Sequence, residues 1–391
     1  MNRTRVGINL LWLAPGEVGG SEDYCIGLLR ALAGHPVSRR ELEVILYVNR
    51  EADETYPDLA RSFETRRAPI GGRRRLTRVL AEHTWLLATT KRDRRELVHH
   101  LGGTMPFLRS VPGVMLLHDL QAWAMPHNFS RIKRNYLYLT VPHSVRRALA
   151  VTTLSDWTRR DIHERFDVPL SRMVCLPPGG EHLAARTNST PDERAVLELY
   201  GIHDRPFFVY PVITYRHKNH ERLIAAFARI ADQHPDALLV LTGGEGPAEA
   251  DVRRSIEREG MASQVRRLGR VPTDALEVLY RHTTALTFPS RYEGFGMPVL
   301  EVMHHGRPVV AAAAGALPEV VGDGGVLIDP DDTWAWANAL DELLRDPMYW
   351  ERMASAAAKR AAAFRWDSTV DELVALYQRA ARSSRAGVES R

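Results

Sequence analysis

The chain has 391 residues, of which 45% are hydrophobic and 26% are charged. Both fractions are ordinary for a soluble globular protein, and the net charge of +4 is too small to indicate a partner by itself. A chain of this length exceeds one ordinary hydrophobic core, so we expect two domains.

The first fifteen residues superficially resemble a signal peptide. However, Asn9 interrupts their apolar run and no small-residue cleavage site follows, so a buried first strand explains the pattern as well. No apolar run reaches the length that spans a bilayer. Cys25 and Cys175 lack the spacing of a metal site and fit a reducing compartment. We therefore expect a cytoplasmic protein, either free or at the cytoplasmic face of the membrane.

The first predicted unit is a strand over residues 6–13, a glycine turn at Gly19 and Gly20, and a helix that ends near Leu32. A strand, a glycine turn and a helix are typical of the opening of a Rossmann-like half. The glycines do not have the Gly-x-Gly-x-x-Gly spacing of a dinucleotide site. A tight turn that needs glycine for its conformation explains the pair without any ligand.

Basic residues cluster in the first half of the chain. Ten lie between Arg66 and Arg95, against Glu82 and Asp93, and five more lie between Arg131 and Arg147 without an acid. Such clusters can bind a membrane surface, a phosphorylated acceptor or nucleic acid, although a solvated face explains them too. Residues 76–87 predict a basic amphipathic helix, which is either a membrane or acceptor element or a packing helix with exposed arginines.

Residues 113–120 predict a strand that ends in His118 and Asp119. In doubly wound sheets, ligands bind outside the carboxyl ends of the strands, so His118 is well positioned to meet one. A structural histidine with its hydrogen bonds satisfied is the alternative. Another strand enters a capped helix at residues 150–162, and residues 174–180 end the first half.

The composition suggests where the domains divide. The stretch from Glu181 to Asp204 is polar and without a clear period, which favours a linker. The predicted organisation is an N-terminal domain over residues 1–182, a linker over 183–205, a C-terminal domain over 206–365, a final helix over 366–382 and a disordered tail over 383–391.

The second half opens with a strand from Phe207 that leads through Arg216 and Lys218 into a helix. A cationic pair at the carboxyl end of a strand suits a pyrophosphate, because charge-assisted bonds to phosphate are strong. A surface charge pair is the alternative, but cations at a helix start are unfavourable to the helix dipole. That penalty favours a function for Arg216 and Lys218.

Two further strands and one acidic motif follow. Residues 237–246 predict a strand and a glycine turn, and residues 265–271 predict a strand that ends at Arg270. The stretch from Asp329 to Asp332 contains Asp-x-Asp, a motif whose carboxylates bind a divalent metal in some enzymes. Here it lies between a strand and a helix, so we expect Asp331 or Asp332 to cap the helix instead.

The most informative stretch is residues 284–301, which predict a buried strand, a turn with Gly294 and Gly296, and a helix that begins at Pro298. A glycine turn before a helix presents free amides and the positive end of the helix dipole, which favours a phosphate. Glu293 and Glu301 bracket this turn. Two carboxylates around a phosphate site indicate a ligand that carries both hydroxyls and phosphates.

This stretch reads Pro-Ser-x-x-Glu-Gly-Phe-Gly-x-Pro-x-x-Glu, which resembles the signature of the family-4 retaining glycosyltransferases (glycosyl transferases group 1). The continuation through Gly306-Arg-Pro-Val-Val-Ala and Gly315-Ala-Leu-Pro-Glu matches the same family. The resemblance covers nearly the whole chain and is more specific in the second half. It implies an α/β fold of the GT-B type, with two Rossmann-like doubly wound domains facing across a cleft.

The resemblance also implies roles for particular residues. The second domain holds a nucleotide-sugar donor and the first holds the acceptor. Glu301 bonds the ribose hydroxyls, Glu293 positions the donor sugar, and His118 lies beside the transferred sugar. The remaining expected donor contacts are Lys218, Arg216 and the amides of Gly294, Phe295, Gly296 and Met297 at the diphosphate, Gly20 towards the donor phosphate and acceptor, and Arg270 near the base.

The family implies transfer with retention and with no metal or other cofactor. A front-face route is expected, in which the donor phosphate helps to deprotonate the acceptor hydroxyl; double displacement through a carboxylate nucleophile stays open. The variant around Lys218, Tyr-Pro-x-x-x-Tyr-x-His-Lys-Asn-His, favours mannose or rhamnose as the sugar.

Expected partners are the nucleotide sugar and a carbohydrate or lipid-linked acceptor, with membrane contact through the basic first domain and no nucleic acid. A cell-envelope glycan and a glycosylated natural product both fit as products. Two alternatives come from other classes. A nicotinamide dehydrogenase lacks support because the glycine fingerprint is missing, and a non-catalytic sugar-nucleotide binder is disfavoured because His118, Lys218, Glu293 and Glu301 occur together.

Overall fold

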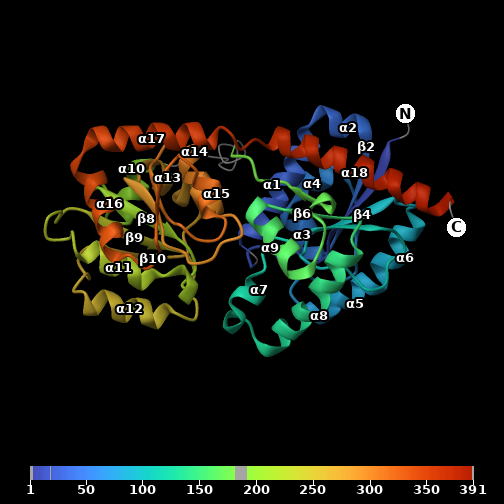
Figure 1. Cartoon of the computed structure of the whole chain (residues 1–391), viewed down its shortest axis with the longest axis horizontal. Helices are drawn as coiled ribbons and strands as arrows, with labels where there is room; N and C mark the ends of the chain where they lie inside the picture. The colour runs from blue at the N-terminus through green and yellow to red at the C-terminus, as the bar shows by residue number, and fades with distance from the viewer. Residues whose placement is uncertain (1–2, 18, 181–191, 390–391) are drawn as a thin grey trace. The chain divides into compact units, whose positions relative to one another are not determined.

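The computed structural model describes residues 3–17, 19–180 and 192–389, with side chains to residue 383. The chain divides into two compact units (Figure 1). Unit 1 consists of Met1–Gly179 and Arg365–Arg391, and unit 2 consists of Gly180–Phe364. Among the described residues, no helix is both long enough and apolar enough to cross a membrane.

Unit 1 is built on a seven-stranded sheet of order β3-β2-β1-β4-β5-β6-β7, in which every pairing is parallel. Its inner strands are almost continuously buried, because helices cover both faces of a parallel sheet. The strands are β1 (Thr4–Leu10), β2 (Leu42–Val48), β3 (Glu64–Arg67), β4 (Leu97–His100), β5 (Gly113–Leu116), β6 (Ala150–Thr153) and β7 (Met173–Cys175).

The helices of unit 1 fill the connections between these strands, and the last one comes from the end of the chain. They are α1 (Gly20–Gly34), α2 (Pro36–Glu41), α3 (Arg50–Thr55), α4 (Pro57–Ser62), α5 (Arg75–His83), α6 (Trp85–Arg92), α7 (Gln121–Ala124), α8 (Arg131–Arg147), α9 (Asp156–Phe166) and α18 (Trp366–Glu389), with 3-10 turns η1 (Pro126–Asn128) and η2 (Leu170–Arg172).

Unit 2 has a six-stranded parallel sheet of order β10-β9-β8-β11-β12-β13. Its strands are β8 (Phe207–Pro211), β9 (Leu238–Thr242), β10 (Val265–Gly269), β11 (Ala285–Phe288), β12 (Val309–Ala312) and β13 (Val326–Ile328). Its helices are α10 (Glu193–Leu199), η4 (Arg216–Lys218), α11 (His220–Ala228), α12 (Glu249–Arg258), α13 (Thr273–His282), α14 (Met297–His304), α15 (Leu317–Val321), α16 (Thr333–Arg345) and α17 (Pro347–Ala361).

Both sheets follow the doubly wound order in which the strands run outward in two directions from a central pair. In unit 1 the order reverses between β1 and β4, and in unit 2 it reverses between β8 and β11. The prediction of two Rossmann-like α/β units is therefore confirmed. Ligands of such sheets bind at the carboxyl ends of the strands beside the reversal, so these two places are where a site is expected.

Helix α18 returns the chain to unit 1 and packs on its sheet, in a position that leaves Val370, Leu373 and Tyr377 fully buried. The hydroxyl of Tyr377 lies 2.8 Å from Nδ1 of His99 in β4, and Nε2 of the same ring lies 3.1 Å from the hydroxyl of Thr152 in β6. The helix is thus joined to the sheet by a buried polar network as well as by apolar packing.

Three sequence expectations need correction. The predicted linker over 183–205 contains helix α10, which Asp192 caps by accepting from the Ala195 amide at 3.2 Å; the part of that linker before Asp192 lies outside the described residues. The tail predicted as disordered from residue 383 continues α18 to Glu389, since no proline interrupts it. The helix predicted over 76–87 is interrupted at Thr84, which divides it into α5 and α6.

Candidate active site

At the strand reversal of unit 2, a lysine and a glutamate from two different loops form an ion pair. Lys218 follows β8 and Glu293 follows β11, and the lysine Nζ lies 2.6 Å from the glutamate Oε1. Both side chains are largely buried, at 17% and 13% exposure. A buried cation and a buried anion therefore meet at the place where the fold predicts a ligand.

Backbone contacts hold the two loops together. The Tyr210 hydroxyl donates to the Lys218 carbonyl at 2.5 Å, which holds the backbone of the lysine against β8. The Arg291 amide donates to the His217 carbonyl at 2.8 Å, and the Asn219 side chain donates to the Pro289 carbonyl at 3.2 Å. The positions of Lys218 and Glu293 are thus set by hydrogen bonds between their loops and not only by their own ion pair.

Glycines allow a third loop to approach Glu293 closely. Gly315 has a φ of +59°, and a Cβ added there would lie 2.6 Å from the Glu293 carbonyl oxygen. The next amide, of Ala316, donates to that same carbonyl at 3.0 Å. Any larger residue at position 315 would push the Glu293 backbone away, which explains why glycine follows β12 here.

The turn after Glu293 leads directly into α14. Gly296 is the N-cap of this helix with a φ of +98°, and Met297 is its first residue, so the amides of this turn lie at the positive end of the helix. Phe295 is buried, with its ring 5.8 Å from that of Phe364. Glu301 lies one turn into α14 and is buried. Together with Lys218, this arrangement can bind a phosphate beside a carboxylate.

Two predicted residues are not brought to the Lys218–Glu293 pair. Arg216 shares the turn η4 with Lys218, but its guanidinium is exposed and lies 3.7 Å from the Asp251 carboxylate of α12. Arg270 follows β10 and is exposed, with its Nε 4.0 Å from where a Cβ on Gly244 would lie. Arg270 is thus beside the glycine turn after β9, on the far side of β9 from the central strand β8.

The Asp-x-Asp motif is used within unit 2. Asp332 caps α16, because its carboxylate accepts from the amides of Trp334 and Ala335 at 3.1 and 3.0 Å. Asp331 receives both ends of the Arg291 guanidinium, with an Nη1–Oδ2 distance of 2.8 Å, and this bond lowers the pKa of Asp331. The cap expected from the sequence is present, and Arg291 holds the loop that carries Glu293.

In unit 1, His118 lies just beyond β5, between two aromatic rings. Its ring centroid is 6.4 Å from that of Trp12 and 6.0 Å from that of Tyr24. Its Nε2–H donates to the Leu101 carbonyl at 3.3 Å, which leaves Nδ1 as the acceptor of the neutral ring. Burial lowers the pKa of His118 to about 4, although the Leu101 bond opposes this. His118 is therefore an uncharged polar group near neutral pH.

The glycine pair lies at the start of α1. Gly19 is the N-cap with a φ of +60°, so the special conformation belongs to Gly19, and Gly20 is the first residue of the helix. Glu22 is buried and accepts from the Gly16 amide at 2.9 Å and from the Tyr56 hydroxyl. A carboxylate that already has these partners stabilises the turn.

Four residues at this edge of unit 1 were not predicted as site residues. Asn9 of β1 donates to Oε1 of Glu82 at 2.7 Å and to Nδ1 of His100 at 3.2 Å. Burial raises the pKa of Glu82 to about 7 and lowers that of His100 to about 3. Trp12 follows β1, and its buried indole N–H has no hydrogen-bond partner among the described residues. The one signal in the sequence was the interruption of an apolar run by Asn9.

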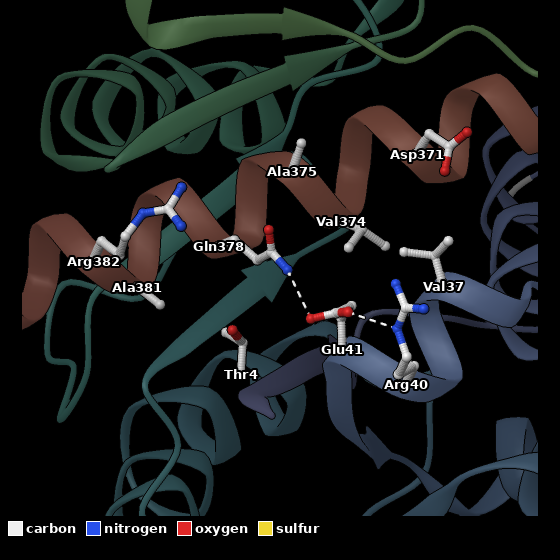
Figure 2. Close-up of a pocket in the computed structure, with 10 residues that line it drawn as sticks. All are labelled: Thr4, Val37, Arg40, Glu41, Asp371, Val374, Ala375, Gln378, Ala381 and Arg382. Carbon is white, nitrogen blue, oxygen red and sulfur yellow. Dashed lines mark hydrogen bonds and ion pairs between the residues drawn. The ribbon is translucent and has the colours of Figure 1, made fainter. Parts of the chain in front are cut away.

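A hollow of about 660 Å³ lies elsewhere in unit 1, between α2 and α18 (Figure 2). There, Gln378 and Arg40 both donate to the Glu41 carboxylate, at 3.4 and 2.8 Å. Thr4 also lines it, at the amino end of β1. The hollow thus lies at the edge of the sheet opposite to the strand ends that lead to Trp12 and His118, and we assign it no part in the site.

Comparison with known proteins identifies the family. The model of glycosyl transferases group 1 matches residues 198–360, and the model of glycosyltransferase family 4 matches residues 18–180. The alpha-D-kanosaminyltransferase of Streptomyces kanamyceticus is 30% identical over 316 residues, which cover 75% of this chain and 81% of that protein. The chain belongs to the group 1, family-4 glycosyltransferases. This excludes the nicotinamide dehydrogenase as an alternative.

Other relatives of the glycosyltransferase agree. The O-antigen chain mannosyltransferase B of Escherichia coli is 27% identical over 292 residues, which cover 73% of this chain and 75% of that protein. Among solved structures, sucrose-phosphate synthase from Thermosynechococcus elongatus has a TM-score of 0.72 at 23% identity, covering 96% of this chain and 99% of that one. The HepE structure from Anabaena with UDP and glucose has a TM-score of 0.69 at 20% identity, covering 95% and 98%. These structures establish the GT-B fold class.

Proposed function

We propose that this glycosyltransferase moves a hexose, with retention and without a metal, from a nucleoside diphosphate sugar bound by unit 2 to an acceptor hydroxyl bound by unit 1. The observation that carries the proposal is the Lys218–Glu293 pair, which joins a cation and a carboxylate at 2.6 Å beside the start of α14. Nucleotide sugars present the matching chemistry, since their diphosphate is anionic and their hexose carries hydroxyls.

On the donor side, Lys218 and the amides from Gly294 to Met297 bind the diphosphate, which becomes more negative as the sugar leaves. Glu293 accepts hydrogen bonds from the sugar hydroxyls, and the buried Glu301 accepts from the ribose. Arg216 and Arg270 are proposed as secondary contacts only. Arg216 would have to turn away from Asp251 to reach a phosphate, whereas Arg270 lies at the glycine loop where a base can stack.

The chemical step follows a front-face route. The bond between the sugar C1 and the phosphate oxygen breaks, and its electron pair goes to the diphosphate. The acceptor oxygen bonds to C1 from the same face, and its proton passes to the departing phosphate. Neutral His118 orients the sugar through hydrogen bonding and needs no proton of its own to exchange. Metal independence is supported by the internal use of Asp329 and Asp331, the two carboxylates of the Asp-x-Asp motif, which accept from the Asp331 amide and from Arg291.

The sugar that we favour is mannose or rhamnose, and the acceptor that we favour is a carbohydrate or lipid-linked glycan of the cell envelope. The similarity to an O-antigen chain mannosyltransferase supports this choice. The similarity to a kanosaminyltransferase supports a second candidate, glycosylation of a natural product. We also propose that the enzyme works in the cytoplasm, where the thiols of Cys25 and Cys175 stay reduced.

A thermal-shift panel tests the donor site. UDP, GDP, dTDP, ADP and NAD are added separately, each with and without magnesium. We expect one nucleoside diphosphate to raise the melting temperature equally in both conditions, because a ligand that binds only the folded state stabilises it. Stabilisation by NAD alone, or only in the presence of magnesium, contradicts the proposal. The sugar nucleotides of the selected base then identify the donor by turnover.

Retention is checked on the product. Nuclear magnetic resonance of the new glycosidic linkage should give the same anomeric configuration as the donor. Inversion refutes the proposed stereochemistry. A covalent sugar trapped on Glu293 with a slow donor analogue would establish double displacement in place of the front-face route.

A further inference from the structure

Large apolar side chains are exposed together on one part of unit 1. Seven of the eleven exposed large hydrophobic residues among the described ones lie on α5, on α8 and in the short segment 107–108. We call this surface the α5–α8 face. Its apolar members, with exposures from 39% to 84%, are Leu76, Leu80, Phe107, Leu108, Ile132, Tyr138 and Leu139.

These segments adjoin one another (Figure 1). The Phe107 amide donates to His83 of α5 at 3.0 Å, and the Phe107 ring lies 4.5 Å from that of His143 in α8. Val79 and Leu80 of α5, with Tyr136 of α8, line one hollow of about 290 Å³ with mostly apolar walls. The exposed leucines and isoleucine thus lie on adjoining segments of unit 1.

Cations surround this apolar surface. Arg73, Arg74 and Arg75 lie at the start of α5, and Arg131, Lys133 and Arg134 lie at the start of α8, whereas Arg78 turns inward and donates to the Trp12 carbonyl. Neither helix has an acid in its first turn, so both begin with cations against the positive end of their own dipole. This arrangement is unfavourable for the isolated protein and indicates an external anion.

Few acids compensate these charges. Glu17 lies 3.4 Å from Arg73, Asp119 attracts Lys133, and Glu82 lies on the buried side of α5, where it accepts from Asn9. Among the described residues, Arg74, Arg75, Arg131 and Arg134 have no carboxylate within ion-pair distance. Burial and, after it, the charge of Arg75 lower the pKa of Lys133, because the cation of α5 lies near that of α8.

We propose that the α5–α8 face docks on an anionic lipid bilayer, with its apolar side chains among the acyl chains and its cations at the headgroups. Leu76 and Leu80 are four residues apart in α5, so they share one face of that helix. Ile132 and Leu139 are seven residues apart in α8 and likewise share one face. Interleaved aliphatic and basic side chains are what such an interface requires. This proposal specifies the membrane contact of the proposed function. It rests on that function only in one respect, which is that membrane docking would give access to a lipid-linked acceptor.

Other occupants fit this surface less well. A second copy of the chain would bring two cationic faces together, which costs free energy through repulsion. A nucleic acid would match the charge, but exposed leucine and isoleucine neither stack on bases nor donate to them. An acidic protein would match the charge as well. If the face serves such a protein and not a membrane, the full chain should fail to bind vesicles in the experiment below.

Co-sedimentation of the full chain with vesicles tests the proposal. We expect binding to vesicles of phosphatidylglycerol mixed with phosphatidylcholine and no binding to phosphatidylcholine alone. Added salt should weaken the binding, because surface charges are screened. Absence of binding to the anionic vesicles, equal binding to both kinds, or a dimer in solution that buries Ile132 and Leu139 overturns the proposal.

Two pairs of variants separate the contributions. Ile132→Ser with Leu139→Ser should weaken vesicle binding roughly ten-fold or more, whereas Leu199→Ser with Trp334→Ser, which removes equally exposed apolar groups from unit 2, should not. Arg74→Gln with Arg131→Gln should also weaken binding roughly ten-fold, whereas Arg352→Gln with Lys359→Gln should not. Equal effects from a pair and its control contradict the assignment of the face.

Donor binding distinguishes failure of this proposal from failure of the proposed function. The surface variants should keep the same melting temperature and the same shift with the selected nucleoside diphosphate. Vesicle binding that persists without any nucleotide response would leave the docking face correct and the transferase site wrong. A nucleotide response without vesicle binding would give the reverse.

Discussion

The two Rossmann-like units have the same strand order but opposite chemistry at the point where that order reverses. In unit 2 the reversal carries a charged pair, Lys218 and Glu293, held within largely buried loops. In unit 1 it carries a neutral His118, whose pKa burial lowers to about 4, and Glu82, whose pKa burial raises to about 7, so that it is partly protonated near neutral pH. Aromatic rings of Trp12 and Tyr24 flank His118.

The difference fits two different ligands. A charged pair next to a helix start suits a diphosphate, whose charge must be matched, whereas neutral polar groups and aromatic rings suit sugar hydroxyls and ring faces. The fold thus supplies the location in both units, and the side chains that follow the strands decide which ligand it takes.

The largest expected effect comes from removing the charge in unit 2. Lys218→Ala should lower kcat/KM about a thousand-fold, because the diphosphate loses its buried cation as it departs. Glu293→Gln should also abolish most transfer; its amide oxygen still accepts a hydrogen bond from Lys218, but the buried lysine loses its counter-charge. Steady-state rates with the identified donor measure both, and Lys359→Ala is the matched exposed control. Normal activity of either variant would show that the pair is structural.

A smaller effect is expected in unit 1. His118→Ala should lower kcat about a hundred-fold through lost orientation of the sugar, with little change in nucleotide binding. Because the pKa of His118 lies at about 4, the ring is neutral from pH 5.5 upward, and the rate should show no limb near pH 6.5 from this residue. A rate profile with such a limb that disappears in His118→Ala would contradict the neutral assignment.

Acid should destabilise unit 1 more than unit 2. The pKa values of His99 and His100 are lowered to about 3 and that of His118 to about 4 in unit 1, against His220 at about 3 in unit 2. Below pH 6.5 these histidines bind protons in the unfolded state but not in the folded state. The free energy of unfolding therefore decreases as the pH is lowered, by about 2 kcal/mol per ring at pH 5.

Glu82 partly opposes this loss. Its pKa is raised to about 7 in the folded state, so between pH 7 and 4.5 Glu82 binds a proton in the folded chain but not in the unfolded chain. Lowering the pH through this range therefore stabilises the folded state at this residue. It offsets about one histidine and leaves unit 1 the more sensitive. Thermal unfolding at pH 7.5 and 5.0, with limited proteolysis to identify which unit opens first, measures the difference. Earlier opening of unit 2 would reverse the expectation.

The smallest effect is expected at Asp332, the carboxylate that directly follows the Asp-x-Asp motif. Asp332→Ala should lower the stability of unit 2 by about 1 kcal/mol through loss of the α16 cap and leave transfer unchanged. Activity should also be the same with and without EDTA. A variant that folds normally but loses transfer, or loses it only after chelation, would show that Asp332 binds a metal.

The sequence predicted unit 2 better than unit 1, and the reason is local. Around Glu293 the strand, the glycine turn and the helix lie within one short stretch, so spacing alone indicated the site. That Lys218 would meet Glu293 could be expected because both follow strands of one parallel sheet. The direction of Arg216 could not, since it depends on the rotamer of one exposed side chain and on Asp251, which belongs to another element.

In unit 1 the informative contacts join distant parts of the chain. Asn9 meets Glu82 of α5 and His100 of β4, and no periodicity in the sequence indicates which of many polar residues will pair across such separations. The break at Thr84 and the extent of α18 were missed for another reason. Neither has a proline or glycine cluster to signal it, so packing decides where these helices stop.

Helix α18 has a consequence for the order in which the protein is made. The sheet of unit 1 is synthesised first, but Tyr377, which bonds His99 of that sheet, leaves the ribosome only after the whole of unit 2. Unit 2 is complete in sequence before α18 exists, so it can finish folding while unit 1 still exposes the apolar surface that Val370 and Leu373 later cover. A ribosome that pauses or stops just after Phe364 would therefore release a chain with one finished half and one open half.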